Sequence, residues 1–386
     1  MNRRAVLAGG ITALAGCQTL SRRTDSTPAQ SEVEWRQIGR DETHRSVAPD
    51  GVIPEGISRH GAVELSGARH TSPVGDSDRV VACDERGLAV YPLDEAVPSS
   101  HVDLPGTVPR CPAIDDDRVV TTRYVTDTDT AVVVSVADRT VEWTRQLPGR
   151  VVLAPAVADG TVYTGTDESY VGLDASTGAI RWQTDDGISP SRWDRIATAN
   201  LAPAVTDDTV VVSRGRGVVS IDRTTGARNW EYDGGRVFSA PAINERTVYV
   251  PEKTGLTALA VETGDRQWQL EADGAWPTPA VGDDHVVTGT TGGLVTVDRE
   301  TGARVDTLSN PFSSVFPSGV GLVGGEVLTG SQGHGAFLVG VDDGAFNPDT
   351  ARRFGAQSYY TPAFVAGRVA FVHYSPKSEL VILSAD

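Results

Sequence analysis

The chain has 386 residues, of which 39% are hydrophobic, and its formal net charge is −17. It contains no run of about 20 consecutive apolar residues, which excludes an ordinary transmembrane helix. It also lacks a basic stripe that could displace counterions from phosphates, so the composition argues against nucleic-acid binding.

The first residues carry an export signal. Arg3 and Arg4 precede a short apolar run, which is typical of a twin-arginine signal peptide rather than of a core helix. Residues 14–17 read Leu-Ala-Gly-Cys and resemble a lipobox, in which the cysteine is acylated after cleavage. We therefore predict a lipoprotein signal peptide over residues 1–16 and lipidation of Cys17. The protein is expected to be exported and lipid-anchored on the cell-surface side of the cytoplasmic membrane.

Two segments without a repeat follow the signal. Residues 17–32 are rich in Ser, Thr and Gln and show no periodicity, which predicts a flexible tether. Residues 33–60, which include Trp35, are expected to form an N-terminal arm that crosses the outside or one face of the domain that follows.

That domain, residues 61–386, is built from an internal repeat. Its most regular copy begins at Ala154-Pro155 and ends at Trp182. Each copy contains four short strand-like segments separated by turn signals, which is the content of one propeller blade. We therefore predict an all-β fold, an eight-bladed β-propeller. The eight copies start at Pro73, Pro112, Pro155, Pro203, Pro241, Pro279, Pro317 and Pro362.

The repeated residues have structural roles. The proline opens the innermost strand, where a missing N–H matters least. The Asp174-x-x-x-Gly178 segment closes a tight turn, because the carboxylate accepts from turn amides and glycine supplies a positive φ. Trp182, four residues further on, is expected in the outermost strand, where it packs on the next blade.

The two ends of the domain are predicted to close the ring. The chain ends at residues 380–386, where a third strand finishes and a fourth is missing. Residues 61–66 resemble that fourth strand and would leave no open sheet edge. The alternative, that residues 33–38 supply the closing strand, remains open. Cys83 and Cys111 lack metal-ligand spacing, and they either form a disulfide between neighbouring blades or remain two buried thiols.

Strand order assigns the loops to two faces. The first-to-second and third-to-fourth turns share one face, and the second-to-third turns and blade crossovers share the other. The longest loops fall on the second face and are expected at residues 123–130, 188–200, 331–335 and 347–360. Two candidate sites lie on this face. The first is at the mouth of the central channel and is either a binding pocket or a plug. It consists of His70, Arg110, Phe238, Trp276, Phe316, Tyr359 and Tyr360. The second lies in the 188–200 loop: Arg192, Trp193 and Arg195.

The Pro-Ala-Val…Leu-Asp-x-x-Thr-Gly-x-x-x-Trp unit resembles the PQQ-like repeat of pyrroloquinoline-quinone enzymes. The resemblance covers residues 61–386 and implies one of two functions. Quinoprotein alcohol dehydrogenases hold PQQ and calcium in such a propeller, whereas the BamB-like assembly lipoproteins use one as a non-catalytic scaffold. The dehydrogenases stack the cofactor on a disulfide of adjacent cysteines and bind calcium through Glu, Asn and Asp. This chain has no adjacent cysteines and no matching acid-and-Asn motif, so we expect no cofactor and no metal.

The chain therefore resembles the lipoprotein scaffolds more closely. We expect a monomeric propeller that reaches the membrane through its lipid anchor and binds an unidentified protein partner or small ligand. The acidic residues comprise 34 Asp and 17 Glu, and the basic residues comprise 32 Arg and two Lys (Lys253 and Lys377). This composition resembles that of proteins from extremely halophilic archaea, and the alternative is an ordinary acidic surface protein from a GC-rich genome.

Overall fold

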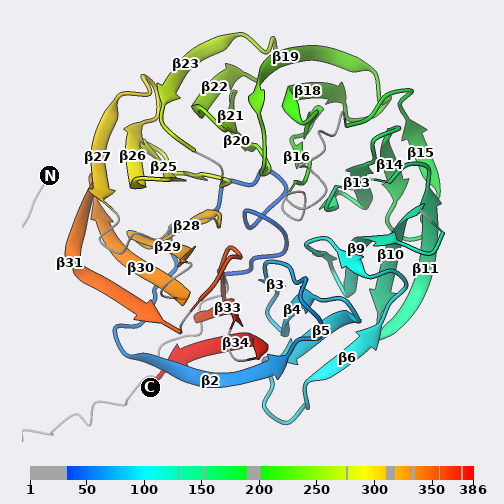
Figure 1. Cartoon of the computed structure of the whole chain (residues 1–386), viewed down its shortest axis with the longest axis horizontal. Coiled ribbons are helices and arrows are strands. Elements are labelled where there is room, and N and C mark those ends of the chain that lie inside the picture. Colours follow the sequence, from blue (N-terminus) through cyan, green and yellow to red (C-terminus); the bar gives the residue numbers. More distant parts are fainter. Residues whose placement is uncertain are drawn as a thin grey trace, which may run out of the picture. The chain divides into compact units, whose positions relative to one another are not determined.

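Eight sheets surround a central axis in the computed structural model (Figure 1). The structure describes residues 33–128, 130–150, 153–188, 201–274, 277–309, 318–331, 335–355, 357–374 and 377–386. These residues belong to one unit, Ser31–Asp386. They form strands and turns but no helix, so no membrane-spanning helix is found among them. The predicted all-β, eight-bladed propeller is confirmed.

The first four blades follow one another along the chain. Blade 1 contains β3 (Val74–Gly75), β4 (Arg79–Cys83), β5 (Gly87–Pro92) and β6 (Ser100–Asp103). Blade 2 contains β7 (Val108–Pro109), β8 (Ala113–Asp115), β9 (Arg118–Val125), β10 (Thr130–Ala137) and β11 (Thr140–Leu147). Blade 3 contains β12 (Ala156–Ala158), β13 (Thr161–Gly165), β14 (Tyr170–Asp174) and β15 (Ile180–Gln183). Blade 4 contains β16 (Ala204–Val205), β17 (Thr209–Ser213), β18 (Arg216–Asp222) and β19 (Arg228–Arg236).

The last two of the remaining four blades include strands from the N-terminal region. Blade 5 contains β20 (Ala242–Asn244), β21 (Thr247–Glu252), β22 (Gly255–Ala260) and β23 (Arg266–Glu271). Blade 6 contains β24 (Ala280–Val281), β25 (His285–Thr290), β26 (Gly293–Asp298) and β27 (Arg304–Ser309). Blade 7 contains β1 (Val47–Ala48), β28 (Val320–Val323), β29 (Glu326–Ser331), β30 (Gly335–Asp342) and β31 (Ala345–Phe354). Blade 8 contains β32 (Ala363–Val365), β33 (Arg368–Tyr374), β34 (Ser378–Ala385) and β2 (Ile57–Glu64).

Burial along the strands explains why the blades need one another. The second strand of blade 3, β13, is buried at every residue, because a neighbouring blade covers each side of the sheet. The outermost strand of blade 5, β23, instead alternates buried Trp268 and Leu270 with exposed polar residues. An isolated blade would expose both apolar sides, so the sheets are stable only as a ring.

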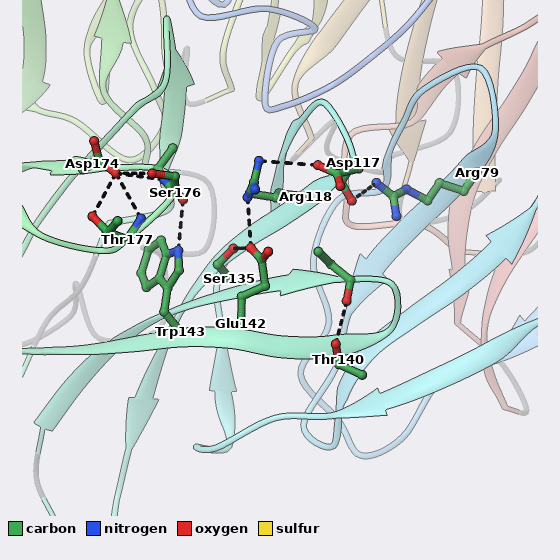
Figure 2. Close-up of polar contacts among 12 residues, drawn as sticks. Arg79, Asp117, Arg118, Ser135, Thr140, Glu142, Trp143, Asp174, Ser176 and Thr177 are labelled. Atoms are coloured by element: carbon green, nitrogen blue, oxygen red, sulfur yellow. Dashed lines mark hydrogen bonds and ion pairs between the residues drawn. The ribbon is translucent and has the colours of Figure 1, made fainter.

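A tryptophan joins neighbouring blades at four of the seams. Trp143 in β11 lies against Gly178 of blade 3, where an added Cβ would come within 2.6 Å of the indole. Its Nε1–H donates to the carbonyl of Ala175 at 2.9 Å (Figure 2). Asp174 closes the same turn by accepting from the amides of Ser176 and Thr177 at 3.1 and 3.0 Å. The same indole–glycine contact recurs for Trp182 on Gly226, Trp230 on Gly264 and Trp268 on Gly302.

The ring closes through an N-terminal strand, as predicted. In Figure 1 the blue β2 lies beside the red β34, and their antiparallel register runs from Ile57 opposite Ala385 to Glu64 opposite Glu379. The closing strand therefore begins at Ile57 rather than at residue 61, so residues 57–60 belong to the ring and not to the arm. The alternative of a closing strand at residues 33–38 is wrong, because these residues lie near the axis.

The N-terminal arm passes through the middle of the ring (Figure 1). Trp35 pairs with Gly75 of blade 1 through two hydrogen bonds of 2.9 and 2.8 Å. Further along, β1 pairs in parallel with β28 of blade 7. Between these points Ile38 is buried in one apolar cluster with Ala154, Ala202 and Ala240, small residues that precede the opening prolines of three blades. The arm therefore occupies the channel at one end instead of crossing the outside.

Candidate binding surface on the crossover face

The two faces of the ring differ in what covers their centres. We call the face with the second-to-third turns and blade crossovers the crossover face, and the opposite one the turn face. The inner strand of each blade runs from the crossover face to the turn face. The arm bonds to residues near the far ends of these strands, such as Val205 and Ile243, and so covers the channel on the turn face. Only the crossover face can hold the predicted mouth.

Three of the predicted mouth residues come together on the crossover face at the seam between blades 8 and 1. The ring of His70 meets that of Tyr360 edge-on, with centroids 6.3 Å apart, and the backbone N–H of His70 donates to Tyr360 Oη at 3.3 Å. Tyr374, which sequence reasoning missed, lies among them: its ring is 5.3 Å from His70, 5.6 Å from Tyr359 and 6.4 Å from Tyr360. We call His70, Tyr359, Tyr360 and Tyr374 the aromatic cluster.

The aromatic cluster grades from buried to exposed. His70 is 2% exposed, whereas Tyr359 is 37% exposed and forms the solvent side of the cluster. Burial lowers the pKa of His70, and the carboxylates of Asp84 and Glu85 oppose this change. Burial also raises the pKa of Tyr360 and Tyr374. His70, Tyr360 and Tyr374 are therefore uncharged near neutral pH, and the cluster has a fixed interior and one open aromatic side.

A basic pair flanks the aromatic cluster on blades 1 and 2. Arg110 is buried and donates to the carbonyl of Pro109 at 3.2 Å. Burial, and then the positive charge of Arg69, lower the pKa of Arg110 to about 10. Arg69 extends into solvent, with Glu85 3.8 Å away. Although the whole chain is acidic, this part of the crossover face carries two cationic side chains, of which Arg69 is exposed and Arg110 is buried.

Two side chains fix the turns beside the aromatic cluster. Asp84 is fully buried and accepts from the amides of Ser66 and Gly87 at 2.7 and 2.8 Å, and the His101 Nε2 lies 2.9 Å away. Arg123 is also fully buried, and it donates to four carbonyls at 2.6–3.1 Å, which belong to Asp84, Glu85, Pro105 and Gly106. Arg123 therefore joins the second-to-third turn of blade 1 to the crossover into blade 2.

The structure corrects two of the predicted loops. Residues 123–125 end β9, so the predicted 123–130 loop shrinks to the turn before β10. Residues 347–354 belong to β31, the outermost strand of blade 7, and only the remainder of the 347–360 segment is a crossover. The segment begins with Asn-Pro-Asp, which predicts a turn, and for this reason the sequence did not predict a strand here.

Apart from the aromatic cluster and Arg110, Phe238 is the one predicted site residue that lies in the part of the chain that the structure describes. Phe238 is half-buried between β19 and β20, on a crossover several blades away from Tyr359. The remaining candidates lie outside the described residues: Arg3, Arg4, Cys17, Arg192, Trp193, Arg195, Trp276 and Phe316. Tyr374 could have been found from the sequence, because it ends the second strand of blade 8 and so belongs to the same face.

The described cysteines and acidic residues do not match those that hold PQQ and calcium in the quinoprotein dehydrogenases. Cys83 ends β4 and Cys111 precedes β8, so they lie on different blades, and both are buried free thiols. Burial raises the pKa of Cys83 to about 11. Within the described ranges no group of three or more His, Cys, Asp or Glu side chains is placed to hold a metal. The disulfide of adjacent cysteines cannot form from this pair, so we derive no reaction through the quinone.

Comparison with known proteins agrees with the repeat. The model of the family described as outer membrane protein assembly factor BamB matches residues 79–195 and 188–385. No curated protein sequence matches the chain.

Solved structures share the fold at low sequence identity. BamB from Moraxella catarrhalis is similar with a TM-score of 0.67 and 14% identity, over 85% of this chain and 99% of that one. The computationally designed Ika8 protein has a TM-score of 0.62 and 15% identity, over 82% and 98%. Quinohemoprotein alcohol dehydrogenase from Comamonas testosteroni has a TM-score of 0.51 and 11% identity, over 92% and 81%.

Proposed function

The chain belongs to the family described as outer membrane protein assembly factor BamB, and from this membership we propose that it is an extracytoplasmic, membrane-anchored scaffold that binds proteins and catalyses no reaction. The family description names the assembly of outer membrane proteins. The composition resembles that of proteins from haloarchaea, whose cells have no outer membrane. Our proposal therefore covers the binding of proteins but not the assembly of outer membrane proteins.

One observation carries the binding role, the aromatic cluster with its single open side. Tyr359 is exposed at its edge and packs on Tyr374, which in turn stacks on Tyr360. Tyrosines held in this way offer a large contact area with little entropy to lose on binding. Arg69, which is exposed next to them and has Glu85 3.8 Å away, favours a partner segment that carries a carboxylate. The arm covers the other end of the channel, so a partner approaches from the crossover face.

Export and anchoring belong to the same proposal. The twin arginines and the lipobox at Cys17 support a lipid-anchored protein outside the cytoplasmic membrane. The acidic composition supports a high-salt environment, in which surface repulsion is screened.

The alternative, a PQQ-dependent dehydrogenase, shares the fold but lacks the adjacent-cysteine platform. A titration of the purified protein with PQQ and Ca²⁺, followed by visible absorbance, separates the two proposals. We expect the spectrum to equal the sum of the spectra of the free protein and free PQQ at every ratio of PQQ to protein. A saturable spectral change at one quinone per chain would replace the scaffold with the enzyme.

A further inference from the structure

The inner edges of all eight blades donate to the arm. The innermost strand of a propeller blade has an unpaired edge that faces the axis, and its N–H groups need acceptors. In blade 2 the amide of Ile114 donates to the carbonyl of Arg36 at 2.7 Å. In blade 5 the amide of Ile243 donates to the carbonyl of Thr43, also at 2.7 Å.

The other blades repeat this contact around the axis. In total seven blades donate to arm carbonyls, and blade 3 donates to the side-chain oxygen of Gln37 instead. The donor and acceptor pairs are Gly75 to Trp35, Ile114 to Arg36, Val157 to Gln37, Val205 to Glu42, Ile243 to Thr43, Val281 to Arg45, Leu322 to Ser46 and Ala366 to Val33. Residues 33–46 thus satisfy one amide in each of the eight blades.

Three arm side chains add selectivity to these main-chain bonds. Gln37 is 4% exposed, and its amide both donates to and accepts from the backbone of Val157, at 3.2 and 2.9 Å. Trp35 is 1% exposed and lies so close to Gly321 of blade 7 that a Cβ there would be 2.9 Å from its Cη2. Ile38 is buried in one apolar cluster with the small residues that precede the opening prolines of blades 3, 4 and 5. A pocket for an indole and a pocket for an aliphatic side chain are therefore built into the ring.

The arm takes its conformation from the ring. Within the arm itself there are the bridge between Gln37 and Arg40, the two residues of β1 and turn bonds such as Ser46 to Gly39 at 2.8 Å. Arg40, His44 and Ser46 have φ values of +82°, +59° and +57°, a region that such residues avoid unless their surroundings impose it. Its charges also match, since Arg45 lies 3.1 Å from Asp283 of blade 6. The arm behaves as a bound peptide that happens to be covalently attached.

We propose that the inner edges of the eight blades form a peptide-binding site, which residues 33–48 occupy in cis. The ligand class is a polypeptide that curves around the axis, offers backbone carbonyls to the blades and carries a tryptophan for the pocket beside Gly321. Main-chain bonds of this kind accept many sequences, whereas the side-chain pockets select among them. The covalent link keeps the arm at an effective concentration in the millimolar range, so a free peptide competes only after the link is cut. This inference does not depend on the proposed partner at the crossover face.

The test cuts the full chain between the arm and β2. Val52 is 72% exposed, so a protease recognition sequence placed after it is accessible, and circular dichroism before the cut checks that the ring, in which the next residue, Ile53, is buried, has kept its fold. The folded protein is cut, and a fluorescent peptide of residues 33–52 is added. Anisotropy and gel filtration at high NaCl then report its uptake. The uncut chain, the same peptide with Trp35→Ala and a scrambled peptide are the controls.

We expect the cut chain to remain folded by circular dichroism and to take up the peptide saturably. The uncut chain should take up none, and the Trp35→Ala peptide should bind at least about 100-fold more weakly. If the ring unfolds on cutting, the arm is part of the core and the proposal is wrong. Equal uptake by cut and uncut chains, no uptake by a cut chain from which the arm has been washed, or equal binding of the two peptides would also overturn it.

Discussion

The indole of Trp182 in blade 3 lies on Gly226 of blade 4, and its Nε1–H donates to the carbonyl of Arg223 at 2.9 Å. An added Cβ at Gly226 would be 2.8 Å from Cε3 of that indole, and the φ of Gly226 is +76°. The turn that ends the third strand of one blade is thus shaped to receive the outermost strand of the blade before it. This contact is why the Asp-x-x-x-Gly and Trp positions repeat together.

Replacing Trp182 by alanine should therefore weaken the seam between blades 3 and 4. The indole is 8% exposed, and its removal leaves a cavity and an unpaired Arg223 carbonyl. We expect the free energy of unfolding to fall by about 3–5 kcal/mol in denaturant titrations. Ile180→Ala, in the same strand at a side chain that is 45% exposed, is the matched control and should change it by less than about 0.5 kcal/mol. Equal effects of the two changes would refute the role of the seam.

Gly226→Ala tests the other side of the same contact. The new methyl group meets the indole, and a positive φ is strained for alanine, so we expect a loss of about 1–3 kcal/mol. The double variant with Trp182→Ala should lose less than the sum of the two single changes, because removal of the indole makes room for the methyl group. Additive losses would show that the two residues do not act on one another.

The ring was predictable from the sequence because its signals are local. A proline directly precedes the innermost strand in each blade where that proline is described, and the tryptophans recur at fixed distances from the turns. The missing last strand identified β2 from a simple count. The path of the arm was not predictable, since its acceptors are almost all backbone carbonyls and carry no residue signal. One of its positive φ values falls on a glycine, Gly39, but those of Arg40, His44 and Ser46 have no such signal in the sequence.

The candidate site was only partly accessible from the sequence for a similar reason. Position before an opening proline correctly placed His70 and Tyr360 in one cluster, because equivalent positions of neighbouring blades converge. The strand order places Tyr374 on the same face, but the contacts that Tyr374 and Arg123 make from the second strands of their blades depend on the twist and spacing of the sheets. A one-dimensional repeat does not contain that information.

The arm also predicts a pH dependence of stability. His44 is fully buried, its Nδ1 lies 3.0 Å from the carbonyl of Pro241, and burial lowers its pKa to about 4 although Asp41 opposes this. In the unfolded chain His44 takes up a proton near pH 6.5, whereas in the folded chain it stays neutral down to a pH of about 4. The contribution of His44 is therefore fully present above pH 6.5 and is lost as the pH falls towards 4, by on the order of 2–3 kcal/mol.

The variant His44→Asn isolates this effect. Asparagine tolerates the positive φ and keeps a donor for Pro241, but it does not titrate. Denaturant titrations at pH 7.5, 5.5 and 4.5 should show the wild-type chain losing more stability than the variant as the pH falls. Burial lowers the pKa of His70 as well, so the loss of stability that His70 causes at low pH is common to both chains. Parallel pH profiles of the two proteins would rule out a role for His44.

Salt should stabilise the ring. The net charge is −17, and many carboxylates stand side by side in exposed turns. Burial and the neighbouring Asp116 raise the pKa of Asp115, which reports repulsion within one such turn. We expect unfolding to begin as NaCl falls below about 1 M, since the Debye length then grows beyond about 3 Å. Circular dichroism during dialysis measures this, and KCl serves as the control for a sodium-specific effect. A signal that is unchanged down to about 0.1 M NaCl would contradict the halophilic interpretation.

The central claim, that the crossover face binds a protein partner, is tested most directly by affinity capture from detergent-solubilised membranes at high NaCl. The chain carrying Tyr359→Ala with Arg69→Ala is compared with the wild type. A control carries Tyr91→Ala with Arg246→Ala near the turn face, and circular dichroism confirms that all three are folded. The account predicts that the wild type and the control retain the same partner and that the crossover-face variant loses it. Equal capture by all three chains, or loss only in the control, would contradict it.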